Sequence, residues 1–100
     1  MTTPSHEPVA ITGMAVLLPG ARDLAAYWDN LVSGTDALTD APAWRWDPGC
    51  YPDPVYCRRG GFVDGLAEFE PTRFGLMPHA VASTDPDQLI ALAVAADALA

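Results

Sequence analysis

Cysteine and histidine side chains are the candidates for nucleophilic or acid–base chemistry in this 100-residue chain, which contains two of each. Cys57 is followed directly by Arg58 and Arg59, whose positive charges favour the reactive thiolate. However, it precedes a Gly-Gly-Phe sequence on a predicted loop and lacks both a small-residue elbow and a neighbouring histidine. We therefore interpret Cys57, and Cys50 in a Pro-rich segment, as buried or inert thiols.

The histidines and the acidic pair near the end of the chain have structural explanations. His79 lies shortly before a predicted helix, and a lone histidine of this kind favours a hydrogen-bonded structural residue over a general base. Neither His79 nor His6 pairs with a cysteine at the spacing of zinc sites, so we expect no metal site. Asp85 and Asp87 are explained by helix capping and by interaction with the helix dipole.

The charge and the apolar runs exclude several classes of partner. With 13 acidic and 5 basic residues, the formal net charge of −8 repels nucleic acids and anionic membrane surfaces. Residues 1–8 have no signal-peptide features, so we expect Met1 to be the mature N-terminus and the protein to be cytoplasmic. The longest apolar run, residues 89–96, is shorter than the ~20 residues that span a bilayer. In a chain without signs of secretion, a disulfide between the two cysteines is not expected.

Local patterns predict a strand and a helix in the first third of the chain. The near-continuous apolar run at residues 9–18 predicts a buried strand that ends at a Pro19-Gly20 turn. Gly13 within it either kinks the strand or lets another backbone approach closely. Asp23 is placed to cap an amphipathic helix that Gly34 ends. The apolar stripe of that helix consists of Leu24, Tyr27, Trp28, Leu31 and Val32.

The middle of the chain predicts a long ordered loop. Four prolines interrupt regular structure at residues 40–59, and large rings are expected to anchor this loop by packing. Those rings are Trp44, Trp46, Tyr51 and Tyr56; shaping of a substrate entrance or a partner surface is the alternative role for the first three. A short strand at residues 60–63, a turn at 64–65 and a helical turn containing Pro71, flanked by Phe69 and Phe74, follow.

The last helix has the best start signal. Asp85 is the expected N-cap, Pro86 the first helical residue, and Gln88 occupies the position of a capping box. Apolar residues then lie on nearly every side, which is typical of a helix covered by other elements. Because the pattern is still in progress at Ala100, we expect the chain to be the beginning of a larger domain and to be unstable alone.

Short fragments in a fixed order resemble a known family. They are EPVAITGMA at residues 7–15, PGA at 19–21, YW at 27–28 with Leu31, Gly34 with DAL at 36–38, RWD at 45–47, GGF at 60–62, FGL at 74–76 with Pro78, and DP at 85–86 with Gln88. Each fragment is weak alone, but the ordered series is specific. It resembles the N-terminal part of β-ketoacyl synthase domains, the condensing enzymes of type I polyketide and fatty-acid synthases.

The resemblance implies an α/β fold: the first part of the N-terminal half of a thiolase-like αβαβα sandwich. It divides the chain into a flexible tail at residues 1–6 and the truncated synthase portion at residues 7–100. The implied acyltransferase reaction is decarboxylative Claisen condensation of thioesters carried by the phosphopantetheine of acyl carrier protein, in a homodimer with other synthase domains, without metal or nucleotide. The family's nucleophilic cysteine, in a TACSS-like elbow, and its two histidines lie further along than this sequence. No catalytic, cofactor-binding or metal residue is therefore expected here, and the chain alone is expected to be inactive.

Departures from the family pattern concern the start of the last helix. Most modular synthases have SPREAxxMDPQQR, where this chain has Met77, His79, Ala80, Thr84, Asp87 and Leu89. CRRGGF together with MPHAVASTDPDQLIALAVA looks closer to iterative synthases of the polyunsaturated-fatty-acid or heterocyst-glycolipid type. The alternative function is a non-catalytic remnant or split-enzyme subunit that binds a partner synthase chain or acyl carrier protein.

Overall fold

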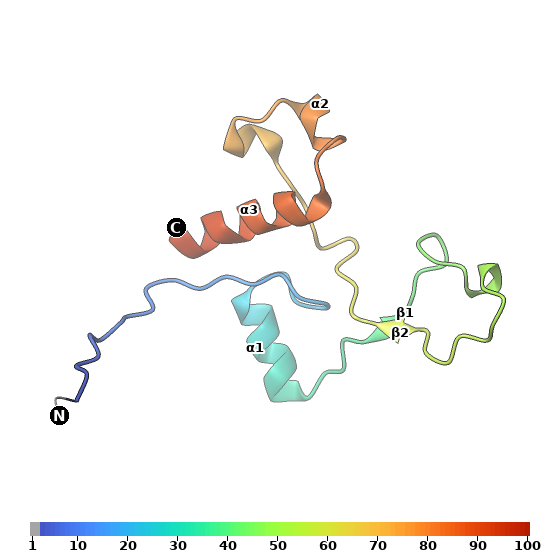
Figure 1. The fold of residues 1–100 in the computed structure, drawn as a ribbon, viewed down its shortest axis with the longest axis horizontal. Coiled ribbons are helices and arrows are strands. Elements are labelled where there is room, and N and C mark those ends of the chain that lie inside the picture. The colour runs from blue at the N-terminus through green and yellow to red at the C-terminus, as the bar shows by residue number, and fades with distance from the viewer. Residues whose placement is uncertain (1–2) are drawn as a thin grey trace.

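The computed structural model describes residues 3–100, so residues 1–2 of the predicted flexible tail, with Met1, lie outside the described residues. Within residues 3–100, three helices, two short strands and two 3₁₀ turns follow one another (Figure 1). They are α1 (Leu24–Ser33), β1 (Thr39–Asp40), η1 (Pro48–Cys50), β2 (Arg59–Gly60), η2 (Pro71–Phe74), α2 (Pro78–Val81) and α3 (Pro86–Leu99).

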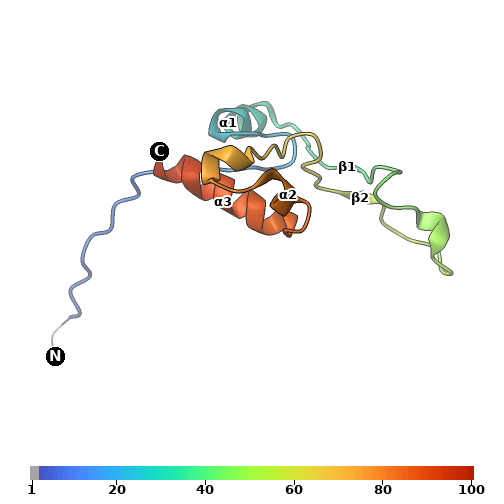
Figure 2. The same cartoon turned by 90° about the horizontal axis from the view of Figure 1, so that it is seen from above.

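The chain is far from close-packed. Its radius of gyration is 19.0 Å, between the ~13 Å of a compact domain of this length and the ~30 Å of an unfolded chain. Among the described residues, Ala21 and Leu89 are the only buried hydrophobic residues. Seen from above, the N-terminal segment and the loop between β1 and β2 project to opposite sides of the helices (Figure 2). Most apolar surfaces are therefore uncovered.

α1 confirms the predicted amphipathic helix. The Asp23 carboxylate accepts a hydrogen bond from the Ala26 backbone N–H at 2.9 Å, which satisfies an amide at the helix start. Gly34 ends the helix at φ 69° and donates to carbonyls in its last turn. The predicted apolar stripe is present but entirely exposed, from Leu24 at 37% to Val32 at 70%.

The predicted strand at residues 9–18 is not formed, which corrects that expectation. Within the described part of the chain, no backbone hydrogen bond joins residues 3–17 to any other residue, and a single bridge links Leu18 and Ala21. A strand requires hydrogen bonds to a neighbouring strand, and residues 9–17 have none within the described residues. The Pro19-Gly20 turn is confirmed by two backbone hydrogen bonds of 2.9 Å between Leu18 and Ala21.

A short ladder closes the long loop. β1 and β2 pair antiparallel, with Thr39 opposite Gly60 and Asp40 opposite Arg59. The predicted strand at residues 60–63 therefore lies earlier and is shorter. The expectation that aromatic packing orders the loop is confirmed for Trp46 and Tyr51, whose ring centroids lie 5.8 Å apart, and is wrong for Trp44 and Tyr56. Only Trp46 is half-buried, while the three other rings, Trp44, Tyr51 and Tyr56, are exposed at 76%, 53% and 103%.

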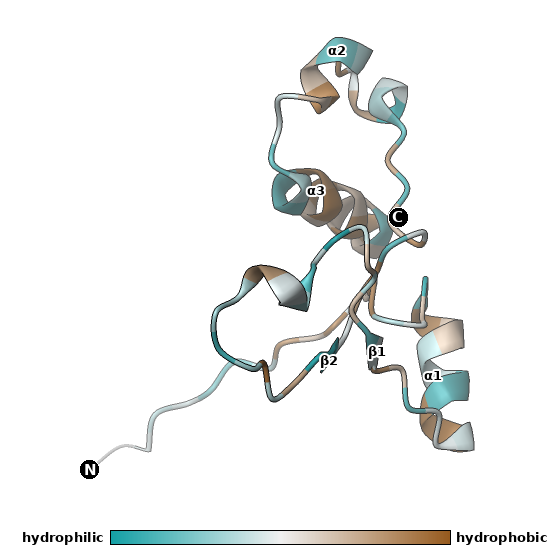
Figure 3. Ribbon diagram, turned by 90° about the vertical axis from the view of Figure 1, so that its right-hand side faces the viewer, coloured by the Kyte–Doolittle hydropathy of each residue, from teal (hydrophilic) through white to brown (hydrophobic). Residues whose placement is uncertain are grey.

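α3 begins as predicted and is apolar over most of its length (Figure 3). Asp85 accepts a hydrogen bond from the Asp87 backbone N–H at 2.9 Å, and Pro86 is the first helical residue. The capping box itself is not completed, because the Gln88 side chain makes no hydrogen bond to the Asp85 backbone N–H among the described hydrogen bonds. η2 confirms the predicted helical turn, where the Phe69 and Phe74 rings stack with centroids 5.1 Å apart.

Candidate functional site

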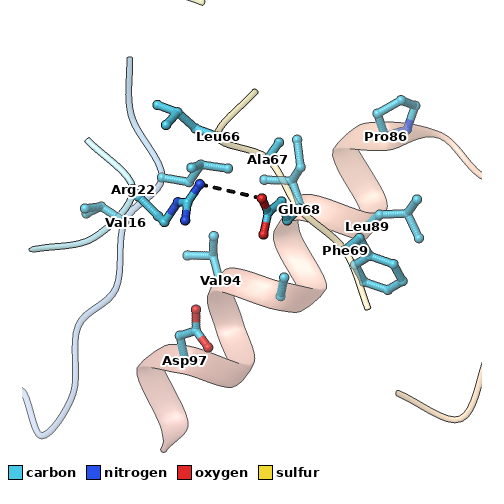
Figure 4. A pocket seen from close by; sticks show the side chains of 13 residues that line it. Val16, Arg22, Leu66, Ala67, Glu68, Phe69, Pro86, Leu89, Val94 and Asp97 are labelled. Carbon is cyan, nitrogen blue, oxygen red and sulfur yellow. Dashed lines mark ion pairs between the residues drawn. The ribbon is translucent and has the colours of Figure 1, made fainter. Parts of the chain in front are cut away.

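An apolar hollow lies between the extended N-terminal segment, residues 66–69 and α3 (Figure 4). Its volume is about 330 Å³. The residues that line it are Val16, Leu17, Arg22, Leu66, Ala67, Glu68, Phe69, Pro86, Leu89, Ile90, Ala93, Val94 and Asp97. None of these is a cysteine, histidine, serine or lysine, so the hollow holds no thiol, imidazole, hydroxyl or amine nucleophile for covalent catalysis.

Ion pairs lie at two positions on this hollow. Arg22 and Glu68 approach to 3.6 Å, as the dashed line in Figure 4 shows. At the other end, Asp97 of α3 forms a 3.0 Å ion pair with Arg73 of η2. Both pairs join segments distant in sequence, and because both are exposed, each contributes little to stability. These pairs were not predicted, because no local sequence pattern indicates a contact between residues so far apart.

Gly13 accounts for the close packing of the N-terminal segment on α3. A Cβ atom at this position would fall on the carbonyl oxygen of Ala98, near the end of the helix. This confirms the prediction that Gly13 permits close approach of another backbone. Gly61 has a similar role, because its Cβ would lie 2.7 Å from Pro19 Cγ. Two glycines thus set how the first segment sits against the rest of the chain.

The two thiols lie in the loop between β1 and β2, and neither lines this hollow. Cys50 and Cys57 are both free and exposed, so a buried environment is excluded. Their sulfur atoms lie 3.7 Å from Asp47 Oδ2 and 3.5 Å from the Arg59 carbonyl oxygen, respectively. No histidine contacts either sulfur in the described hydrogen bonds. Their inertness remains a prediction.

His79 lies exposed on α2, and its ring makes no hydrogen bond among the described residues. The predicted hydrogen-bonded structural role is therefore wrong for the described chain.

Residues 3–100 bring no three histidine, cysteine or acidic side chains together as metal ligands. No helix within residues 3–100 combines the length and apolar character needed to cross a membrane.

A second set of polar contacts fixes the base of the loop. Arg59 donates to the Leu38 carbonyl oxygen at 2.8 Å and to Asp36 Oδ2 at 3.2 Å. The Leu38 backbone N–H donates to Asp36 Oδ1 at 2.9 Å. This backbone bond, then the bond from Arg59, lowers the pKa of Asp36. Hydrogen bonds from the Thr72 hydroxyl and backbone N–H likewise lower the pKa of Glu70.

A second hollow, of about 340 Å³, opens at the same loop base. Trp46, Cys57, Arg58 and Phe62 are among its lining residues. Arg45, which also lines it, forms a 2.6 Å ion pair with Asp64 and lies over the Phe62 ring, 5.8 Å from its centroid. This arrangement holds the loop base together, and it places no acid–base pair beside the Cys57 sulfur.

Comparison with known proteins shows which protein family the chain is similar to. Residues 6–100 match the family described as Beta-ketoacyl synthase, N-terminal domain. Polyketide synthase ThaQ of Burkholderia thailandensis is 40% identical over 96 residues, which are 86% of this chain and 5% of that protein. Mycoketide-CoA synthase of Mycobacterium tuberculosis is 42% identical over 106 residues, covering 97% of this chain and 3% of the relative.

Solved structures agree. The ketosynthase from module 6 of the bacillaene synthase of Bacillus subtilis 168 matches with a TM-score of 0.80 and 39% identity, covering 89% of this chain and 16% of that one. The oxazolomycin ketosynthase domain of Streptomyces albus matches with a TM-score of 0.73, 33% identity and the same 16% share of its chain. The fold is therefore that of one part of a thiolase-like ketosynthase domain. The chain belongs to the β-ketoacyl synthase family and corresponds to part of its N-terminal domain.

Proposed function

We propose that this chain supplies N-terminal framework to a β-ketoacyl synthase, with residues 7–100 as the contributing portion. The observation that carries this proposal is the TM-score of 0.80 to a solved ketosynthase whose matched part is 16% of its length. In the complete domain, a cysteine thiolate takes an acyl group from a thioester and releases the carrier thiol. A malonyl-type extender then loses carbon dioxide, and its enolate attacks the acyl carbon and expels the cysteine thiolate. The product is a β-ketoacyl thioester for polyketide or fatty-acid synthesis.

This chain contributes none of the reacting groups in that scheme. Its thiols are exposed on the loop, without histidine partners among the described hydrogen bonds. An oxyanion hole and imidazoles that stabilise the enolate are further requirements of the reaction. The complete enzyme accepts acyl groups from the phosphopantetheine of acyl carrier protein, acts as a homodimer with other synthase domains, and works in the cytoplasm. The iterative polyunsaturated-fatty-acid or heterocyst-glycolipid subtype stays a prediction.

A chimaera tests the proposed function. This chain replaces the aligned segment of the bacillaene ketosynthase, and the folded chimaera is incubated with an acyl-pantetheine thioester. Intact-protein mass spectrometry is expected to show one acyl group on the cysteine of the bacillaene portion and none on Cys50 or Cys57. Acylation of the 100-residue chain alone would contradict its assignment as framework. A folded chimaera that acquires no acyl group would refute the proposed function.

The second candidate function is a non-catalytic remnant or split-enzyme subunit that binds a partner synthase chain or acyl carrier protein. The exposed apolar surface of α1 and of the N-terminal segment favours it, because such surface on a protein marks an interaction site. Two pull-downs distinguish the partners. One uses isolated acyl carrier protein, and the other uses a synthase chain without the carrier. Binding in the first identifies the carrier as the partner, and binding in the second identifies the synthase chain.

A further inference from the structure

The base of the loop between β1 and β2 is an exception to the acidic character of the chain. Residues 40–60 contain three of the five basic residues but only three of the thirteen acidic ones. The basic residues are Arg45, Arg58 and Arg59, and all of them line the hollow of about 340 Å³ at this base (the loop hollow), which no acidic residue within residues 3–100 lines. The loop hollow shares no lining residue with the hollow beside α3. Positive charge is therefore concentrated at a separate cavity of a negatively charged chain.

Arg58 differs from the other arginines in having no partner within the described residues. Each of the four others forms an ion pair with a carboxylate; they are Arg22, Arg45, Arg59 and Arg73. The Arg58 side chain takes part in no ion pair or hydrogen bond within residues 3–100. A guanidinium stays charged in proteins and offers five N–H donors. The charge and the donors of Arg58 are therefore available to a ligand.

The backbone fixes where Arg58 lies. Its carbonyl oxygen accepts a hydrogen bond from the Ala41 backbone N–H at 2.9 Å, next to the pair that Asp40 and Arg59 form in the β1–β2 ladder. Arg58 also lines a neighbouring hollow of about 530 Å³, together with Asp40 and Asp47. Those two carboxylates repel an anion there, because like charges at short distance are unfavourable. An anionic group that contacts Arg58 is therefore directed to the loop hollow.

The walls of the loop hollow suit a flat apolar group. Trp46 and Phe62 both line it and are half-buried, so part of each ring stays accessible. Other side chains hold these rings: Tyr51 lies with its ring centroid 5.8 Å from that of Trp46, and Arg45 lies over Phe62 at 5.8 Å. The volume of the loop hollow is within the ~300–1,000 Å³ that is usual for small-molecule sites. The hollow thus combines aromatic walls with one unpaired cation.

We infer that the loop hollow binds a small aromatic oxyanion, a carboxylate or a phosphate, with its charged group on Arg58 and its ring against Trp46. A guanidinium binds two oxygens of either group at once. The aromatic walls bury the ring of the ligand and favour it over a bare inorganic ion. The net charge of −8 opposes an anion from a distance, but salt at about 0.1 M screens charges more than about 10 Å away, so the nearby arginines dominate. This binding goes beyond the proposed function, because it involves no acyl transfer.

Two aromatic anions test the inference. Phenyl phosphate and phenylacetate are titrated into the folded chimaera, which carries the whole loop of this chain, and their affinities are measured by isothermal titration calorimetry. The controls are inorganic phosphate, which has no ring, and benzyl alcohol, which has no charge. At least one aromatic anion is expected to bind at least about 10-fold more tightly than either control, because only it uses both the ring and the charge. The tighter anion identifies the preferred oxyanion, and binding no tighter than the controls would overturn the inference.

A matched pair of variants locates the contact. Arg58→Gln and Arg22→Gln each remove one positive charge, but Arg22 does not line the loop hollow. Arg58→Gln is expected to weaken binding of the tighter anion at least about 10-fold, since charged hydrogen bonds are lost, while Arg22→Gln changes the affinity less than about 2-fold. Equal losses would show attraction to the overall charge and contradict the inference. In the unsubstituted chimaera, the anion should shift the NMR signal of the Arg58 side chain and not that of Arg22, which tests the contact without any variant.

A smaller graft covers the case in which the chimaera does not fold. Residues 36–64 alone replace the aligned loop of the bacillaene ketosynthase; they include every residue that lines the loop hollow and the acidic partners of Arg45 and Arg59. The same titrations and the same Arg58→Gln variant are expected to give the same affinities within about 3-fold. A folded graft that binds neither aromatic anion would overturn the inference. Binding is measured without acyl transfer, so a failure of the proposed function is distinguishable from a failure of this inference.

Discussion

At the scale of single residues, the contacts that organise the chain are made by small or short side chains. Gly13 admits the end of α3, Gly61 admits Pro19, and Asp36 binds both the Leu38 amide and Arg59. All of these contacts involve backbone atoms except the bond between the Asp36 and Arg59 side chains. These contacts can order the chain although its hydrophobic core is small, because they depend on sterics and hydrogen bonds rather than on buried area.

Gly13→Ala tests the close approach to α3. The new methyl group would fall on the Ala98 carbonyl oxygen, so the segment must move away from the helix. In the chimaera, we expect the free energy of unfolding to fall by about 1–3 kcal/mol, the usual cost of overpacking. Thr12→Ala, on the open side of the same segment, is the control for helix contact. Equal destabilisation by both variants in denaturant titrations would show that the contact with Ala98 is not the cause.

The Asp36 junction should respond to acid. Its pKa is lowered by the Leu38 amide and then by Arg59, so its folded value lies below its unfolded value. Its contribution to the closed loop base is therefore fully present above the unfolded pKa of about 4 and is lost as pH falls through the lower folded pKa. NMR titration should show the Leu38 amide signal changing with the Asp36 carboxyl. Asp36→Asn should abolish that change, and an unaltered titration of Leu38 would contradict the assignment.

At the scale of elements, helix caps act independently of tertiary packing. α3 begins at Asp85, whose carboxylate accepts the Asp87 amide at 2.9 Å. Asp85→Ala should destabilise the helix by about 1 kcal/mol and lower its helical content in circular dichroism. Asp85→Asn is the matched control, because asparagine caps helices about as well as aspartate. Loss of helix in both variants would point to charge rather than to the cap.

The same distinction explains what the sequence could predict. Helix ends were predicted correctly, because they are specified by contacts within a few residues. The residues that specify them are Asp23, Gly34, Asp85 and Pro86. Residues 9–18 have strand composition, yet pairing depends on a partner backbone that no pattern within the run supplies. The loop rings were expected to pack, but packing also depends on neighbours, and only Trp46 is half-buried. The hollow beside α3 went unpredicted because it is assembled from segments that are distant in sequence.

At the scale of the whole molecule, the chain exposes its apolar faces. The two buried hydrophobic residues of the described chain, Ala21 and Leu89, are not in one extended core, and α1 has no buried residue. The free energy that burial contributes, about 25 cal/mol per Å² of apolar surface, is therefore small. Ordering the backbone costs roughly 1–2 kcal/mol for each residue, which such limited burial cannot offset. The tertiary arrangement should therefore be lost in the isolated chain, and its short helices should be only marginally stable there.

Thermal unfolding tests this expectation. The purified 100-residue chain should lose its circular dichroism signal gradually, because helices without a shared core melt independently rather than in one step. The chimaera should instead show a single sharp transition, since its sheet and second layer cover the apolar faces that the chain leaves open. Calorimetry on both proteins separates the alternatives. A cooperative transition of the monomeric chain, with equal calorimetric and van't Hoff enthalpies, would contradict this expectation. It would mean that the chain folds stably without a partner covering its exposed apolar surface.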